Sequence, residues 1–182
     1  NLTSITIPDR VNSIGSYAFN NCYNLTSVTI GESVTTIGEH AFNNCYRLTS
    51  VIIPNSVTTI GVLAFCGCKR ITSLTIPENV TVIGSAAFQN VTKEGGFALV
   101  LGSNVSEIQQ DAFSGSDVNS VVFGATPIAI GENAFANTKL SYVKIPANVI
   151  SLGKNAFVSD SLKAVSIDAS VLTSGALGEN TL

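Results

Sequence analysis

The chain has 182 residues, of which 45% are hydrophobic and 12% are charged, and its formal net charge is −3. This composition is too apolar for a disordered chain, and the lack of a basic excess argues against nucleic acid as a partner. No stretch approaches the roughly 20 uninterrupted apolar residues that span a bilayer, because polar residues and glycine interrupt every part of the sequence. We therefore expect one elongated domain over residues 1–182, with no membrane insertion in this segment.

An Ala-Phe pair recurs along the whole chain and marks an internal repeat. The pairs end at Phe19, Phe42, Phe65, Phe88, Phe113, Phe135 and Phe157, so consecutive phenylalanines are 23, 23, 23, 25, 22 and 22 residues apart. Each unit also carries a segment related to Leu-x-x-Val-x-Ile. A period in the twenties with this segment is typical of leucine-rich repeats. The prediction is a solenoid of about eight units, a right-handed superhelix with a parallel concave β-sheet and short or helical turns on its convex side.

The first units, from residue 2 to residue 69, are nearly identical, and the unit at residues 25–45 represents them. Period-two alternation places Val28 and Ile30 inward and Thr29 outward, which predicts the concave strand. Residues 34–37 are expected to cross the far side, and Gly38 to provide a turn that other residues would adopt with strain. The Ala-Phe pair then needs a compact turn, with a helical turn as the expected form. The phenylalanines should stack into an internal column.

The repeat is irregular once, in the unit at residues 89–113. Eight residues from Gln89 to Gly96 lengthen the spacing to 25, the leading Leu and the Cys are lost, and Gln109 replaces the glycine. One interpretation is repeat decay, with the extra residues in a surface loop. The other is that the loop leans over one face and takes part in recognition, as insertions in solenoids often do.

The two ends of the sequence differ from the ends of a closed solenoid. Asn1 leads directly into a repeat strand without an initiator Met or a signal sequence, so we expect a fragment of a longer protein. The last unit has no Ala-Phe pair. Its apolar residues Val171, Leu172, Ala176 and Leu177 either form a C-terminal closure or mark the point where the array is cut.

The four cysteines follow the repeat more closely than they follow any metal-binding or disulfide pattern. Cys22, Cys45 and Cys68 each lie three residues after the repeat phenylalanine, which predicts a column of reduced, parallel side chains. Cys66 is out of register, so it is either an exposed thiol or a partner for Cys45 or Cys68. His40 is the one histidine in the chain and occupies a variable surface position, which makes both a metal site and catalysis through it poor hypotheses.

The stretches LTSVTIGESVTTIGEHAFNNC and LTSVIIPNSVTTIGVLAFCGC resemble the BspA-like leucine-rich repeats of bacteria and protists, and the resemblance extends over about residues 2–172. It implies a secreted or surface-displayed protein that binds a host or matrix protein, or a glycan. The family offers no catalytic residues to transfer, so the chain is expected not to be an enzyme and to need no cofactor or metal.

Recognition is expected on the concave strand face, whose outward row is rich in Thr and Ser at first and acquires apolar residues from residue 52 onward. An exposed apolar cluster of this kind marks a binding surface, although β-branched residues also serve strand propensity alone. The candidate ligand-binding residues are Thr29, Ile52, Thr75, Phe97, Val100, Val122, Tyr142 and Lys144. The predicted function is extracellular protein binding or adhesion, and the alternative is a spacer or stalk that presents other domains of a cell-surface protein.

Overall fold

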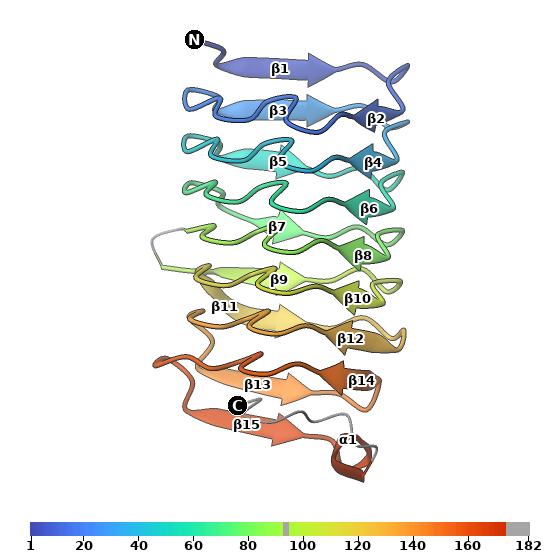
Figure 1. Ribbon diagram of the computed structural model, residues 1–182, viewed down its shortest axis with the longest axis vertical. Helices are drawn as coiled ribbons and strands as arrows, with labels where there is room; N and C mark the ends of the chain where they lie inside the picture. Colours follow the sequence, from blue (N-terminus) through green and yellow to red (C-terminus); the bar gives the residue numbers. More distant parts are fainter. Residues whose placement is uncertain (93–94, 174–182) are drawn as a thin grey trace.

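The computed structural model describes residues 1–92 and 95–173 and shows a parallel β-solenoid of about seven turns, which confirms the predicted fold class. The turns stack along one long axis, and each turn up to β14 places one strand on one side and then a second strand, in most turns a shorter one, on a second side (Figure 1). The strands of the first side carry the odd numbers: β1 (Ser4–Ile7), β3 (Ser27–Ile30), β5 (Ser50–Ile52), β7 (Leu74–Thr75), β9 (Phe97–Val100), β11 (Val118–Val122), β13 (Tyr142–Ile145) and β15 (Ala164–Ile167).

The second side is a continuous seven-stranded parallel sheet that the sequence analysis did not foresee. Its strands are β2 (Ser13–Ile14), β4 (Thr36–Ile37), β6 (Thr59–Ile60), β8 (Val82–Ile83), β10 (Glu107–Ile108), β12 (Ile128–Ile130) and β14 (Val149–Leu152). Most of them are two residues long and contain one inward side chain, so the sequence shows no alternation there. Stacking alone brings these segments into pairing, because each lies beside its equivalent in the next turn.

The sheet of odd-numbered strands is interrupted twice. The strands pair as β1-β3-β5, as β7-β9-β11 and as β13-β15, whereas β5 does not pair with β7 and β11 does not pair with β13. Within each group the pairing follows the repeat, so that Ser27 faces Ser50 and Val28 faces Val51. The interruptions leave two places on this side where neighbouring strands diverge.

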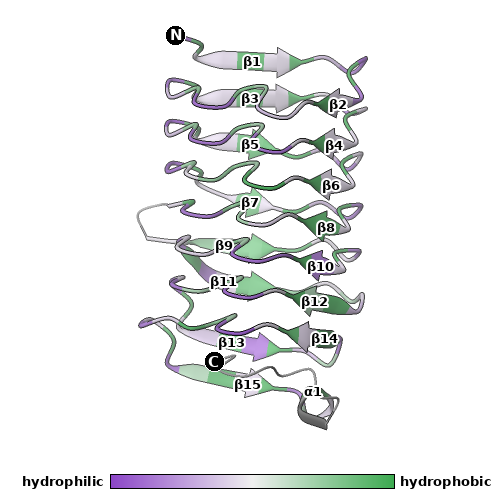
Figure 2. Ribbon diagram, viewed as in Figure 1, coloured by the Kyte–Doolittle hydropathy of each residue, from purple (hydrophilic) through white to green (hydrophobic). Residues whose placement is uncertain are grey.

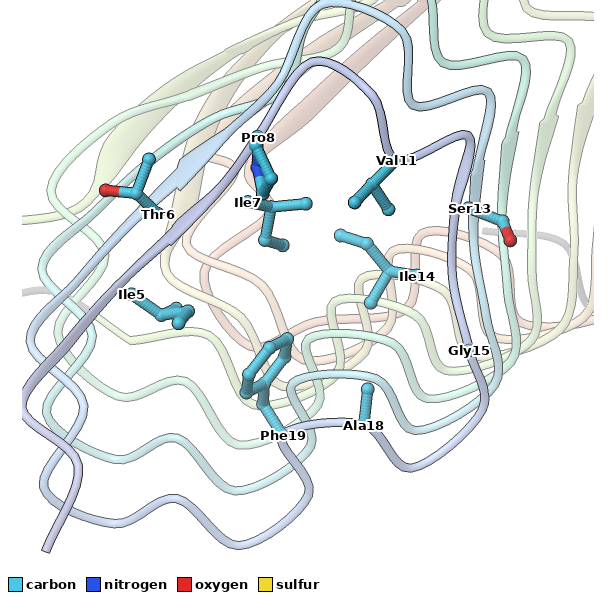
Figure 3. A pocket seen from close by; sticks show the side chains of 10 residues that line it. All are labelled: Ile5, Thr6, Ile7, Pro8, Val11, Ser13, Ile14, Gly15, Ala18 and Phe19. Carbon is cyan, nitrogen blue, oxygen red and sulfur yellow. The ribbon is translucent and has the colours of Figure 1, made fainter.

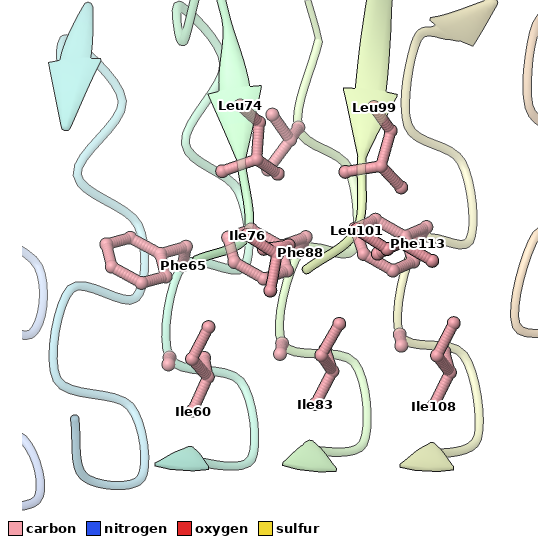
Figure 4. Packing of buried hydrophobic residues seen from close by; sticks show 14 of the residues in the cluster. Ile60, Phe65, Leu74, Ile76, Ile83, Phe88, Leu99, Leu101, Ile108 and Phe113 are labelled. Carbon is pink, nitrogen blue, oxygen red and sulfur yellow. The ribbon is translucent and has the colours of Figure 1, made fainter. Parts of the chain in front are cut away.

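The phenylalanines form the internal column that the repeat predicts. Adjacent rings from Phe19 to Phe157 stack with centroids 5.1 to 5.4 Å apart and nearly parallel planes. Figure 4 shows Phe65, Phe88 and Phe113 in line, with the inward side chains of both sheets on either side of them. All members except the half-buried Phe19 are at most 1% exposed. The column is therefore the centre of a core to which every turn contributes the same positions.

The turn that carries Ala-Phe is not helical, contrary to expectation. In the described residues the one α-helix is α1 (Ala169–Thr173), and the Ala-Phe segment is a run of tight turns with bonds such as Asn43 N–H to the His40 carbonyl (3.2 Å). The residue before each Ala has a positive φ, as in His40 (53°) and Leu63 (55°). These left-handed residues reverse the chain at each turn and so prevent a helix from continuing.

The recurrent Ile-Gly glycines do not supply that left-handed conformation, so the expected role of Gly38 was wrong. Gly38, Gly61 and Gly84 are absent from the residues with positive φ. A Cβ atom at Gly84 would instead lie 2.6 Å from the carbonyl carbon of Gly61 in the preceding turn. Glycine is thus required for close approach of backbones between turns. Gly15, in the first turn, has no atom within 4 Å of the equivalent position.

The described ends of the stack differ in how the interior is covered. At the first turn, apolar side chains including Ile5, Val11 and Phe19 line a cleft of about 290 Å³ (Figure 3). At the other end, α1 carries Val171, which is 1% exposed. The expected closure by Ala176 and Leu177 lies outside the described residues, as does the centre of the irregular loop at residues 93–94.

Candidate functional site

The outward row of the odd-numbered strands is the candidate binding site. We call it the outward row, and it consists of Thr6, Thr29, Ile52, Thr75, Val100, Val122, Lys144 and Ser166, all of which are exposed. Strand pairing places Thr6, Thr29 and Ile52 side by side in the first group of strands. It likewise joins Thr75, Val100 and Val122 in the second group and Lys144 with Ser166 in the third.

Apolar side chains in this row are strongly exposed although the core beneath them is fully packed. Ile52 is 76% exposed, Val122 59% and Val100 43%, and Tyr142 beside the row is 52% exposed. Figure 2 shows β9 and β11 as mainly hydrophobic, and β13 as carrying hydrophilic residues. The face therefore carries threonine in its first strands and acquires exposed apolar residues from Ile52 onward, as the sequence predicts, and Lys144 adds a cation near its far end.

Phe97 is the one candidate that the structure removes from this surface. Its side chain is 4% exposed and lies in the core. Phe97 pairs with Val118, and the register then shifts, so that Ala98 faces Ser120. The unit has one residue fewer between its first two inward positions than its neighbours have. Phe97 consequently takes the inward position that a leucine occupies elsewhere.

Clefts open at both interruptions of the odd-numbered strands. Between β5 and β7 a cleft of about 250 Å³ is lined by Ile52, Thr75 and Pro77, among others. Between β11 and β13 a second cleft, of about 240 Å³, is lined by Val121, Val122, Phe123, Lys144 and Pro146. Each cleft can receive one apolar side chain of a partner, and the second places a cation at its edge. These clefts cannot be predicted from the sequence, because the strands on either side keep the repeat pattern.

His40 lies outside this face and has structural contacts. Its ring stacks on Tyr17 with centroids 4.6 Å apart, its Nδ1 is 3.1 Å from Asn43 Nδ2, and its Nε2 is 3.5 Å from Glu39 Oε1. The side chain is 19% exposed, so the expected surface position is in fact half-buried. No described Ser or Cys is bonded to the ring, so the arrangement supplies no nucleophile for it to activate.

The cysteines occupy the positions that the column predicts. Cys45 and Cys68 are buried and free, and each thiol donates to the carbonyl of the phenylalanine of the preceding turn, at 3.3 Å. Cys22 and Cys66 are also free and are half-buried. Burial, followed by the proximity of Cys22, raises the pKa of the Cys45 thiol to about 12. Such thiols are protonated near neutral pH and are poor nucleophiles and poor metal ligands.

Over residues 1–92 and 95–173, no three His, Cys, Asp or Glu side chains come together in a way that would hold a metal ion. Within the same ranges, no helix has the length and apolar character that a membrane crossing requires.

Stacked turns with a shared phenylalanine column and a broad exposed strand face define a leucine-rich-repeat solenoid. The sequence pattern of the BspA type leucine rich repeat region matches residues 1–94 and 98–177 in six copies. The chain therefore belongs to the BspA-type leucine-rich-repeat family, as the sequence predicted.

Solved structures of bacterial surface and repeat proteins share the fold. A leucine-rich repeat protein from Bacteroides ovatus is 27% identical, with a TM-score of 0.59, over 93% of this chain and 53% of that one. A leucine rich cell surface protein from Faecalibacterium prausnitzii is 24% identical, with a TM-score of 0.59, over 91% and 60%. The T. pallidum leucine rich repeat protein is 21% identical, with a TM-score of 0.60, over 98% and 86%.

The chain spans 53% and 60% of the first two of these structures, so it corresponds to part of their length. No functionally curated protein matches it in sequence.

Proposed function

We propose that this chain is a non-catalytic protein-binding module that acts outside the cell or at the cell surface, with a role in adhesion. The observation that carries the proposal is the run of exposed apolar side chains at Ile52, Val100, Val122 and Tyr142 on an otherwise well-packed solenoid. Exposed apolar clusters of this kind are uncommon on monomeric surfaces and mark interaction sites. The family and its cell-surface relative support the location.

The dimensions of the face suit a protein ligand. Strands of one sheet lie about 4.8 Å apart, so the strands from β1 to β15 give a face roughly 35 Å long and about 600 Å² in area. That area is close to the roughly 800 Å² that each partner buries in an ordinary protein interface. The clefts beside Ile52 and Val122 offer pockets for two apolar anchors, the kind of contact that dominates binding energy.

The test is binding of the purified chain to a panel of extracellular matrix proteins, measured by surface plasmon resonance. Val100→Glu and Tyr142→Ala should each weaken a captured ligand by about tenfold, because they alter exposed side chains of the proposed face. Both should leave thermal unfolding within a few degrees. Glu39→Lys, on the turn beside His40, is the control and should bind as the parent chain does. Loss of capture in the control alone would place the binding face elsewhere.

A spacer function is the second candidate, and the regular stacking of the turns along one axis favours it. In that function the outward row serves strand propensity and binds nothing. A folded chain that captures no member of the matrix panel would support the spacer and exclude the adhesive role for this segment.

A further inference from the structure

A polar hollow lies at the corner between the Ala-Phe turns and the odd-numbered strands, away from the outward row. Its volume is about 500 Å³, against about 250 Å³ for the larger cleft of the outward row. It is lined by Asn44, Tyr46, Cys66, Gly67, Lys69, Asn90 and Thr92. Pockets for small ligands commonly occupy roughly 300 to 1,000 Å³, so the hollow is large enough for a few chemical groups of a ligand.

Gly67 and Gly115 interrupt a column of asparagines, and Gly67 lies in the wall of the hollow. The column consists of left-handed residues two positions after the repeat phenylalanines from Phe19 to Phe135, among them Asn21 (φ 59°), Asn44 (58°), Gly67 (73°) and Asn90 (57°). Asn44 Nδ2 donates to Asn21 Oδ1 at 3.1 Å, which forms one rung of a side-chain ladder. Gly67 has no amide to continue it. A Cβ atom at Gly67 would lie 2.7 Å from Asn44 Oδ1, so this acceptor lies against the position that a side chain at residue 67 would take and would have to move to admit one.

Three basic residues lie on the two turns that form this corner: Lys69 lines the hollow, and Arg47 and Arg70 each follow a lining residue in the sequence. Arg47, Lys69 and Arg70 are exposed, and none of them forms an ion pair within residues 1–92 and 95–173. Arg47 Nη1 lies 3.5 Å from Asn24 Oδ1, which is a neutral acceptor. Three free cations gathered on two adjacent turns of a chain with a net charge of −3 make this corner a locally positive site.

Tyrosines complete the corner and restrict what it can bind. Tyr23 and Tyr46 stack with centroids 5.2 Å apart, and Lys69 Nζ lies 5.4 Å from the centre of the Tyr46 ring. Because Tyr23 comes from the preceding turn and Lys69 from the following one, the Tyr46 ring is covered on both sides. A nucleic-acid base therefore has no free Tyr46 face on which to stack. The ring edges and hydroxyl groups remain available for hydrogen bonds.

We propose that this corner binds an acidic saccharide, that is, a sugar chain bearing carboxylate or sulfate groups. Lys69 and the two arginines would pair with the acid groups through charge-assisted hydrogen bonds. The side chains of Asn44 and Asn90 and the Tyr46 hydroxyl can each donate and accept hydrogen bonds, which suits sugar hydroxyl groups. Equivalent side chains of neighbouring turns are about 4.8 Å apart, so a chain with acid groups on successive sugars would meet cations on successive turns.

The test is isothermal titration of the full chain with four probes of equal length at near-physiological salt. A heparin-derived hexasaccharide carries sulfate and carboxylate groups, hexagalacturonate carries carboxylate alone, maltohexaose is neutral, and hexaglutamate is an acidic peptide. Binding of either acidic saccharide, with no binding of the other two probes, is the expected result. The stronger of the acidic saccharides identifies the acid group that the corner prefers. Failure of both to bind, or equal binding of hexaglutamate, would overturn the proposal.

Two sets of variants separate the hollow from general electrostatic attraction. Lys69→Glu/Arg70→Glu should weaken saccharide binding by about tenfold or more, whereas Lys154→Glu/Lys163→Glu makes the same charge change at exposed lysines elsewhere and should have little effect. Gly67→Asn restores the asparagine column, fills the hollow and leaves every charge in place, so it should also weaken binding by about tenfold. Equal losses in the two charge variants, or full binding by Gly67→Asn with its fold intact, would refute the site.

Discussion

Residues 1–92 and residues 95–173 build the same core but connect their turns with different polar contacts. In the first half, threonine side chains reach from one turn to the carbonyl of the turn before: Thr26 Oγ1 donates to the Thr3 carbonyl (2.9 Å) and Thr49 Oγ1 to that of Thr26 (3.0 Å). In the second half, some side chains still bond across turns, as Ser106 Oγ does to the Thr81 carbonyl (3.2 Å), but the buried hydroxyls of Ser116 and Thr138 bond to the phenylalanine carbonyl of their own turn, at 2.6 and 3.0 Å.

The difference shows what strict repetition contributes. A constant period of 23 places identical polar side chains beside each other, so that each can bond across to the next turn. The later periods of 25 and 22 shift the register, as in the bulge between Val118 and Ser120. Apolar packing tolerates these shifts because it is not directional, whereas hydrogen bonds are. The phenylalanine column is therefore shared by both halves, whereas the regular threonine ladders belong mainly to the first and the inter-turn bonds of the second are less uniform.

The largest expected effect tests the shared core. Phe65→Ala and Phe113→Ala should each lower the free energy of unfolding by about 3 to 5 kcal/mol, because both rings are fully buried between two stacked neighbours. Phe19→Ala should cost less, since its ring is half-buried and stacks on one neighbour. Urea titrations of the three variants measure this. A loss at Phe113 far smaller than at Phe65 would show that the halves do not share one core.

The next largest loss of stability is expected when a glycine at a close contact between two turns is replaced. Gly84→Ala should destabilise the chain by about 1 to 3 kcal/mol, because its new Cβ would meet backbone atoms of Gly61 and Val62 at 2.6 and 2.7 Å. Gly15→Ala is the matched control and should change stability by less than about 0.5 kcal/mol, since the space around Gly15 is open. Equal melting temperatures for the two variants would contradict the packing role assigned to these glycines.

A smaller effect distinguishes the hydrogen bonds of the two halves. Ser116→Ala removes a buried hydroxyl that bonds within its own turn and should cost about 1 kcal/mol. Thr58→Val removes an exposed ladder bond to the Thr35 carbonyl (3.2 Å) and should cost about 0.5 kcal/mol or less, because water can replace it. Denaturant titration measures both. A greater loss at Thr58 would indicate that inter-turn ladders stabilise the first half more than their exposure suggests.

The last comparison concerns the reactivity of the thiols, which occur in the first half alone. Alkylation of the folded chain near neutral pH should modify the half-buried Cys22 and Cys66 before the buried Cys45 and Cys68. Mass spectrometry after timed quenching measures the order, and full modification in denaturant is the control. Preferential labelling of Cys45 would contradict its burial.

The same burial predicts how stability depends on pH. The pKa of Cys45 rises from an ordinary 9.0 to about 12, so the folded state holds this proton more tightly than the unfolded state. The contribution of this group is fully present below pH 9 and is lost as the pH rises toward 12. Cys45→Ala should reduce that slope, as thermal melts across the range would show.

Much of this fold can be predicted because each turn repeats the same pattern of apolar positions. The Ala-Phe spacing alone predicts the column, and the alternation around Thr29 and Ile52 correctly predicts which side chains face outward. Within the candidate site, the prediction that Phe97 faces outward is wrong for a simple reason. A single missing residue between two inward positions reverses the face that a side chain takes, and the repeat pattern was extended across that gap unchanged.

Other features depend on contacts between turns, which a single repeat does not contain. The role of Gly84 is set by the backbone of the preceding turn, and the short strands of the second sheet exist only when stacked. The interruptions beside Ile52 and Val122 are likewise a property of two turns together, since they lie where β5 does not pair with β7 and β11 does not pair with β13. Local sequence preferences carry no information about these distances, although the recurrence of glycine after the inward Ile in most units is a signal of close contact.

The direction of the backbone hydrogen bonds between turns determines how the solenoid responds to a pulling force. Bonds between parallel strands of successive turns run along the stacking axis, from one end of the array toward the other (Figure 1). Tension applied along that axis therefore acts on one turn's bonds at a time and peels the array from an end, instead of shearing many bonds together. Each turn of 23 residues that detaches can release roughly 75 Å of extended chain. The array would thus lengthen in steps under tension, as an extensible tether.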